Sequence, residues 1–164
     1  MYQIVDTAEK VLDEYGGKDV FETAENSGAN VWFRKLGGLK GFYICENGER
    51  YIVINEELDD VMKKVVCAHE FGHDMLHREL SVGGIREGTL FLDTNKTERE
   101  ANLFAACVLI SDEELLDAVN ESADISQVAL LLGFPTEIVK YKLQVMNSKG
   151  YKFRTDDIEN DFLK

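Results

Sequence analysis

The chain has 164 residues, of which 45% are hydrophobic and 30% are charged, and its formal net charge at pH 7 is −13. This composition is typical of a globular domain and excludes wholesale disorder. A chain of this length buries roughly 70% of the surface that its unfolded form exposes, so it can form a core without disulfides. The acidic balance excludes a protein that coats nucleic acid with its whole surface, because phosphate groups would repel it.

Membrane insertion and secretion are not indicated by the sequence. The longest unbroken apolar run, Leu103 to Ile110, is far shorter than a bilayer span. Residues 1–10 lack the basic and apolar segments of a secretory signal. The cysteines, odd in number and without a CxxC pair, are typical of reduced thiols in a protein core, and they are Cys45, Cys67 and Cys107. We therefore expect a cytoplasmic protein without membrane contact.

The first third of the chain predicts two helices and then strands. Apolar periodicity indicates a helix over Asp6–Tyr15 and a second, short helix over Asp19–Ser27. Runs rich in β-branched and aromatic residues then predict strands over Asn30–Leu36, Leu39–Cys45 and Arg50–Asn55. The Asn47-Gly48 turn between the last two runs is a strong hairpin signal. We expect a small, mostly antiparallel sheet of about three strands.

Helical periodicity returns at Leu58 and continues through the only histidines of the chain. Ser81–Asn95 contains glycines and no sustained period, which predicts a loop with a short strand at Thr89–Leu92. Another helix is predicted from Thr97 to Ile110, and Ser111 with Glu114 forms a capping box for the next helix. The last helices are predicted over Ser126–Leu132 and Thr136–Met146.

Residues 69–73 read His-Glu-Phe-Gly-His, an HExxH pattern inside the predicted helix. Residues four positions apart lie on the same helix face, so His69 and His73 can bind one metal ion. Glu70 follows His69, where its carboxylate can take a proton from a water molecule at the site. The alternative is a helix with ordinary core histidines. It fits less well, because all three histidines fall between residues 69 and 77.

The third metal ligand is not settled by spacing. A catalytic zinc site usually has three protein ligands and one open position. His77 lies too far along the helix from His69 to share an ion with both other histidines. The remaining candidates are the carboxylates of Asp93, Glu98 and Glu100.

Only one of Glu98 and Glu100 can face the metal, because residues two apart on a helix point in different directions. Glu98 shares its helix face with Ala101, Asn102 and Ala105. Glu100 shares its face with Leu103, Phe104 and Cys107, an apolar seam expected to pack on the histidine helix. This pattern weakly favours Glu100, but Glu100 also ends a Thr97 capping box and can serve only as a cap.

Two motifs resemble a known family. Residues 67–77, Cys-Ala-His-Glu-Phe-Gly-His-Asp-Met-Leu-His, resemble the active-site helix of the ImmA/IrrE family of metallopeptidases. Residues 98–106, Glu-Arg-Glu-Ala-Asn-Leu-Phe-Ala-Ala, resemble the second motif of that family, ExEANxFA. The resemblance covers Val31 to Ser111, with looser similarity on to Met146. The chain departs from the family at residues 108–111, where Val-Leu-Ile-Ser replaces a proline-terminated stretch, and this concerns a helix end rather than the chemistry.

The resemblance implies an α+β, zincin-like fold with a small sheet, an HExxH helix and a C-terminal, helix-turn-helix-like helical subdomain. It implies one zinc ion held by His69, His73 and Glu100, with Glu70 as the catalytic base. Manganese or iron can also occupy a site of this composition. The candidate donors to the oxyanion of the tetrahedral intermediate, among which the sequence does not choose, are Tyr43, Tyr51 and Arg86.

Members of this family cut helix-turn-helix repressors of mobile elements or of the DNA-damage response. The resemblance therefore implies a zinc-dependent endopeptidase of regulatory type whose protein substrate is such a repressor. The alternative is a binding module or anti-repressor that retains the fold and does not cut. A DNA-binding regulator is a third hypothesis, which the net charge of −13 disfavours.

The C-terminal part of the chain contains a helix, tight turn and helix over residues 125–139. The lysines that follow allow a DNA-binding module or a docking surface for an acidic partner or for a repressor. The favoured interpretation is a helical hairpin that covers the core with its lysines in solvent. We expect a metallopeptidase core over residues 1–111, a helical subdomain over 112–154 and an acidic, frayed tail over 155–164.

Overall fold

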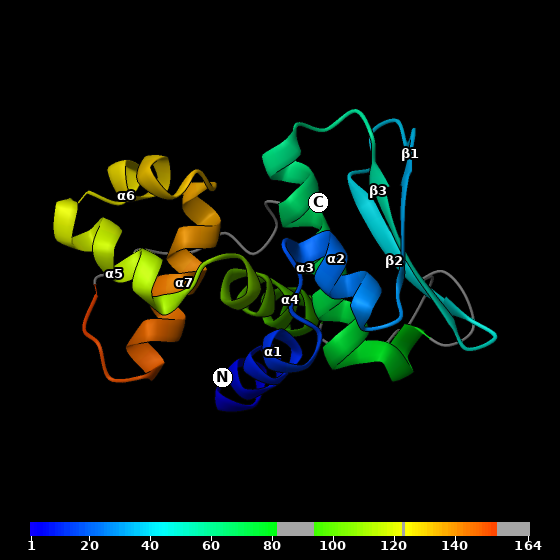
Figure 1. Cartoon of the computed structure of the whole chain (residues 1–164), viewed down its shortest axis with the longest axis horizontal. Coiled ribbons are helices and arrows are strands. Elements are labelled where there is room, and N and C mark those ends of the chain that lie inside the picture. Colours follow the sequence, from blue (N-terminus) through cyan, green and yellow to red (C-terminus); the bar gives the residue numbers. More distant parts are fainter. Residues whose placement is uncertain (82–93, 123, 154–164) are drawn as a thin grey trace.

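The computed structural model describes residues 1–81, 94–122 and 124–153 (Figure 1). Helices and a small sheet make up the described residues, which confirms the expected α+β class. The elements in chain order are α1 (Tyr2–Tyr15), α2 (Val20–Asn26), β1 (Asn30–Arg34), β2 (Gly41–Glu46), β3 (Glu49–Asn55), α3 (Asp60–His77), the 3-10 helix η1 (Arg78–Ser81), α4 (Thr94–Leu109), α5 (Asp112–Glu121), α6 (Ile125–Leu132) and α7 (Thr136–Ser148).

The sheet has the strand order β1-β3-β2. β2 and β3 form the expected antiparallel hairpin, and positive φ angles of 52° at Asn47 and 83° at Gly48 suit a tight hairpin turn. β1 pairs with β3 in parallel, from Asn30 opposite Tyr51 to Arg34 opposite Asn55. The sheet is therefore mixed rather than mostly antiparallel.

The two faces of the sheet have different surroundings. Ile52 and Ile54 of β3 are fully buried in the core, on the face that α3 covers. Strand alternation places Tyr51 on the opposite face, where its ring lies 4.8 Å from the ring of Trp32. α3 therefore lies between this sheet and α4, while α2 contacts both α3 and β1. In Figure 1 the sheet is at one end of the molecule and α5, α6 and α7 are at the other.

Side-chain caps define the helix starts that the sequence predicted. Asp19 caps α2, Asp59 caps α3, and Ser111 forms the predicted capping box with Glu114. Two helices begin earlier than expected: α1 at Tyr2 and α4 at Thr94. The strand predicted at Thr89–Leu92 and the tail at 155–164 lie outside the described residues.

α4 is the central helix of the molecule. It packs against α1, α3 and α7, and every residue from Ala101 to Cys107 is buried. The contact with α3 is close at Gly72, where an added Cβ would lie 3.0 Å from the Cα and carbonyl oxygen of Ala101. A glycine at this position lets the two helix backbones approach. Within the described parts of the chain, no helix has the length and apolar character to cross a bilayer.

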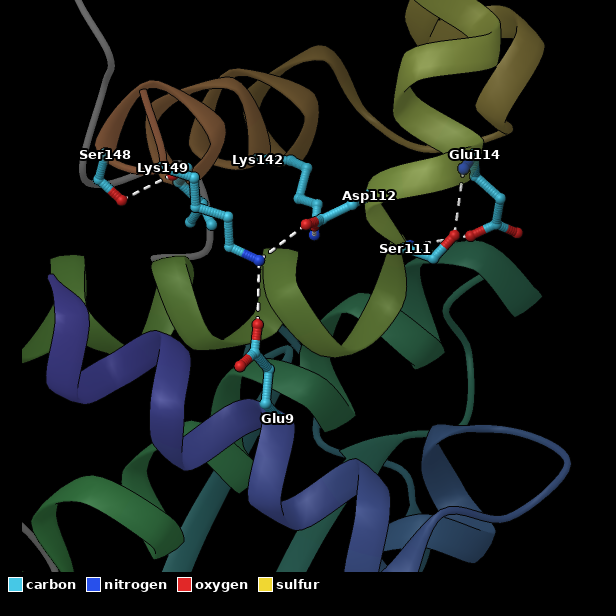
Figure 2. Close-up of polar contacts among 8 residues, drawn as sticks. Glu9, Ser111, Asp112, Glu114, Lys142, Ser148 and Lys149 are labelled. Atoms are coloured by element: carbon cyan, nitrogen blue, oxygen red, sulfur yellow. Dashed lines mark hydrogen bonds and ion pairs between the residues drawn. The ribbon is translucent and has the colours of Figure 1, made fainter. Parts of the chain in front are cut away.

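Two lysines join the C-terminal helices to each other and to α1 (Figure 2). Lys142 of α7 is 3% exposed and donates a 2.7 Å hydrogen bond to Asp112 at the start of α5. Lys149 donates to the same carboxylate at 2.7 Å and to Glu9 of α1 at 3.0 Å. Lys142 thus faces the interior, and the prediction that the α7 lysines face solvent is wrong for this residue. The network joins α1, α5 and α7.

Acid should weaken this network. Partial burial raises the pKa of Asp112, but the hydrogen bonds from Lys142 and Lys149 outweigh it, so the net shift is downward. A lowered pKa in the folded state stabilises the protein above the unfolded pKa of about 3.9, and this contribution is lost as the pH falls through the folded value. We expect Asp112→Asn to lower the free energy of unfolding at pH 7 by about 1–2 kcal/mol, because it leaves Lys142 buried without its carboxylate.

Urea denaturation of both proteins at pH 7 and below pH 4 measures this contribution. The difference between wild type and Asp112→Asn should shrink in acid. A difference that is independent of pH would show that the carboxylate charge does not contribute.

Candidate metal centre

The HExxH helix is α3, and it places its histidines on one buried side. His69, His73 and His77 are 4%, 2% and 7% exposed. The Nε2 atoms of His69 and His73 lie 3.1 Å apart, and the two rings are nearly perpendicular. The structure therefore brings His69 and His73 together, as expected for residues four positions apart on a helix.

Glu98 of α4 completes a group of three ligand atoms. Its Oε2 lies 3.2 Å from His69 Nε2, and its Oε1 lies 3.4 Å from His73 Nε2. The ligand atoms of His69, His73 and Glu98 all fall within 4.8 Å of one another. Two imidazoles and a carboxylate are the donor set of many catalytic zinc sites.

Glu100 lies elsewhere. Its Oε2 is 2.9 Å from His77 Nε2, one helical turn along α3 from His73. This arrangement differs from the sequence-based expectation, because Glu98 rather than Glu100 lies at the histidine pair. The apolar seam used to orient α4 does not discriminate, because every residue from Ala101 to Cys107 is buried, whichever way it faces. The other sequence candidate, Asp93, is outside the described residues.

The charges around the histidine pair favour a cation. Burial raises the pKa of Glu98, but hydrogen bonds from His69 and His73 outweigh it and hold that pKa well below its usual range. Burial lowers the pKa of His69, yet the carboxylates of Glu98 and Glu70 reverse this and the net shift is upward. Glu98 is therefore ionised, and the same field that attracts a proton to His69 attracts a divalent metal ion.

Asn102 fixes the orientation of His69 from behind. Its Oδ1 lies 2.8 Å from His69 Nδ1, and its Nδ2 donates to the Tyr141 hydroxyl at 3.3 Å. An amide oxygen only accepts hydrogen bonds, so Nδ1 of His69 carries a hydrogen and Nε2 is the atom turned toward Glu98. This is the tautomer that a metal ligand needs. Asn102 was not predicted as a site residue, although its i, i+4 spacing from Glu98 places the two side chains on one helix face and was the available signal.

Glu70, the candidate base, is half-buried on α3, and its charge acts on His69. β2 passes close to it, since a Cβ on Gly41 would lie 3.8 Å from Glu70 Cγ. The sequence also offered three oxyanion donors. Tyr43 is engaged, because its hydroxyl donates to Asp74 at 2.8 Å. Tyr51 is on the far face of the sheet, and Arg86 lies outside the described residues.

A buried carboxylate beside the histidines holds α3 to the sheet. Asp74 is fully buried and accepts from Tyr43 of β2, from Arg50 of β3 at 2.6 Å and from Arg78 at 3.0 Å. Arg50 also donates to the carbonyl oxygen of Ser27, at the end of α2. Burial and the bond to Asp74 together raise the pKa of the Tyr43 hydroxyl above its usual range, so Tyr43 stays protonated. Because Asp74 follows His73 directly in α3, these bonds hold the part of α3 that carries His73 against the sheet.

Comparison with known proteins points to one family. The family model of the IrrE N-terminal-like domain, peptidase M78, matches residues 24–144. A protein of Bacillus phage phi105 named uncharacterized immunity region protein 2 is 31% identical over 143 residues, covering 86% of this chain and 90% of the relative. Metallopeptidase ImmA of Bacillus subtilis strain 168 is 26% identical over 154 residues, covering 92% of this chain and 89% of the relative.

The Asp74 cluster gives a prediction about stability. Asp74→Asn keeps the side-chain shape but leaves Arg50 without its buried carboxylate, so we expect a loss of about 3–5 kcal/mol in the free energy of unfolding. The measurement is urea denaturation in the presence of a chelator, so that metal binding does not contribute. Arg78→Ala is the matched control, and because the Arg78 side chain is 46% exposed it should cost at most about 1 kcal/mol. Equal losses in the two variants would contradict this account.

Proposed function

The chain belongs to the IrrE N-terminal-like family of M78 peptidases, and we propose that it is a zinc-dependent endopeptidase of regulatory type. The observation that carries this proposal is the convergence of His69, His73 and Glu98, drawn from α3 and α4, on one buried point. We assign these three residues as the metal ligands. Glu70, next to His69, is assigned as the catalytic base.

The chemistry follows from these positions. A bound zinc ion lowers the pKa of a water molecule toward 7 and polarises the carbonyl group of the scissile bond. Glu70 accepts a proton from the attacking water and delivers it to the leaving amine nitrogen. Glu98 and the oriented rings of His69 and His73 hold the site in one geometry, so little reorganisation accompanies the reaction.

β2 is a candidate surface for the substrate. It forms one edge of the described sheet, and its residue Gly41 lies close to Glu70. An extended segment of a substrate can add to such an edge through main-chain hydrogen bonds. This placement would bring a peptide bond near the proposed base.

We propose a helix-turn-helix transcriptional repressor as the protein substrate. Such repressors carry basic surfaces that bind DNA, and the net charge of −13 on this chain complements them. One relative is named as an immunity region protein of a phage, and another as a metallopeptidase. Free and buried Cys45, Cys67 and Cys107 fit a reducing compartment, and we propose a cytoplasmic location.

The metal assignment predicts that purified wild-type protein contains or takes up about one zinc ion per chain, as a site of two histidines and one carboxylate does. Glu98→Ala should lose this stoichiometric zinc, because one of the three ligands is removed. Elemental analysis after dialysis against trace zinc measures the content, and circular dichroism checks that the variant is folded. Zinc retained by Glu98→Ala and lost by Glu100→Ala would reverse the assignment of the third ligand.

The assignment of Glu70 predicts that Glu70→Gln binds zinc normally but cuts at a rate lower by about 10²–10⁴-fold, because general base catalysis is removed. The assay incubates purified candidate helix-turn-helix repressors with either protein and identifies fragments by mass spectrometry. Cleavage by Glu70→Gln at the wild-type rate would exclude Glu70 as the base. An intact repressor recovered in complex with zinc-loaded wild-type protein would favour the non-cleaving anti-repressor alternative.

A further inference from the structure

We propose that His77 and Glu100 form a positioning pair that orients His73 as a metal ligand. The inference rests on the proposed function, because it assumes that His73 binds the metal through Nε2. It assigns roles to a histidine that is too distant to share the ion and to a carboxylate that the geometry removes from the ligand set.

The three side chains form a continuous hydrogen-bonded chain. Glu100 Oε2 lies 2.9 Å from His77 Nε2, and His77 Nδ1 lies 3.3 Å from His73 Nδ1. His77 is 7% exposed, and the Glu100 side chain is 29% exposed. The hydrogen-bonded series therefore begins at a partly exposed carboxylate and ends at the buried ring of His73. His73 Nε2, at the opposite end of its ring, faces His69 and Glu98.

The donor and acceptor roles along this chain follow from elementary chemistry. A carboxylate only accepts, so His77 Nε2 carries the hydrogen that Glu100 receives. Nδ1 of the neutral His77 ring is then an acceptor, and His73 Nδ1 must donate to it. Without metal, His73 Nε2 faces the carboxylate of Glu98 and donates to it. A bound metal ion would replace that hydrogen, and the hydrogen held on Nδ1 by His77 would keep Nε2 as the ligand atom.

The arrangement repeats the one found at His69. There, Asn102 accepts the Nδ1 hydrogen, so Nε2, on the side of Glu98, is the ring atom that a metal ion would bind. Helix α4 thus supplies three functions along one stretch: Glu98 as ligand, Asn102 behind His69 and Glu100 behind His77. Because Glu98 and Glu100 are two residues apart, their carboxylates point to different turns of α3. Glu98 reaches His69 and His73, and Glu100 reaches His77, so neither carboxylate can take the place of the other.

Among the described residues, a purely structural role for Glu100 would have to rest on its ion pair with Lys96. Lys96 lies 4.0 Å from Glu100 Oε1 and its side chain is 69% exposed, so this ion pair contributes little. The bond to His77 is shorter and much less exposed. The contact that defines the position of Glu100 is therefore the one that leads to His73.

The test measures metal binding rather than catalysis. His77→Phe keeps a flat ring and removes the acceptor for His73, while Glu100→Gln keeps the side-chain shape and removes the charge. We expect each to weaken zinc affinity about 10–100-fold, as loss of outer-shell partners does. Affinity is measured by competition with a chromophoric chelator. The visible absorption of the cobalt(II)-substituted proteins reports the ligand field, which a merely structural role would not move.

Two controls separate this inference from the proposed function. Lys96→Ala removes only the exposed neighbour of Glu100 and should leave zinc affinity and the cobalt spectrum unchanged. Glu98→Ala should lose stoichiometric metal altogether, whereas the His77 and Glu100 variants keep about one ion per chain when saturated. Circular dichroism confirms folding, and Glu100→Gln carries the test if His77→Phe is unfolded.

Wild-type affinity and an unchanged cobalt spectrum in Glu100→Gln and in folded His77→Phe would overturn the positioning role while leaving the metallopeptidase proposal intact. Loss of stoichiometric metal in Glu100→Gln, with metal retained in Glu98→Ala, would make Glu100 a ligand and overturn both assignments. Wild-type protein that takes up no metal would refute the proposed function and the inference together.

Discussion

The close approach of α3 and α4 is the constraint on which the site depends. At Gly72 the backbone of α3 lies so near Ala101 that a side chain would not fit without movement. Because the helices meet there, the carboxylate of Glu98 in α4 lies within 3.4 Å of His69 and His73 on α3. A bulky residue at Gly72 would separate the helices and with them the two parts of the donor set. The HExxH motif on α3 supplies the two histidines, and the packing of α4 against α3 brings Glu98 to them.

Much of the fold follows from local signals. The HExxH helix, the β2–β3 hairpin and the Ser111 capping box rest on contacts between residues close in sequence, and the structure has all three. The parallel pairing of β1 with β3 does not follow from such signals. Residues 35–40 connect β1 to β2 and are long enough to pass the width of one strand, so chain order does not determine sheet order.

The position of Glu98 at the histidine pair was not predicted, for a related reason. Helical periodicity identifies the buried face of a helix that has one exposed side. α4 has none between Ala101 and Cys107, because α1, α3 and α7 surround it. Phe104 does pack on α3, with its ring 5.6 Å from that of Phe71, so the larger apolar residues mark contact with α3 but not the face toward the histidine pair. The small residue Ala101 and the polar Asn102 mark it instead, since close helix contact needs a small side chain and a buried imidazole needs a hydrogen-bond partner.

The Asp74 cluster has a consequence for how the molecule can move. One carboxylate is held by β2, by β3 and by the end of α3, and Arg50 extends the link to α2. These buried bonds hold the sheet and the histidine helix together on the side of the site that carries Glu70. We therefore expect motions that change the site to occur between these two elements and α4. We expect any control of activity to act on that boundary, through the helices that pack on the other sides of α4.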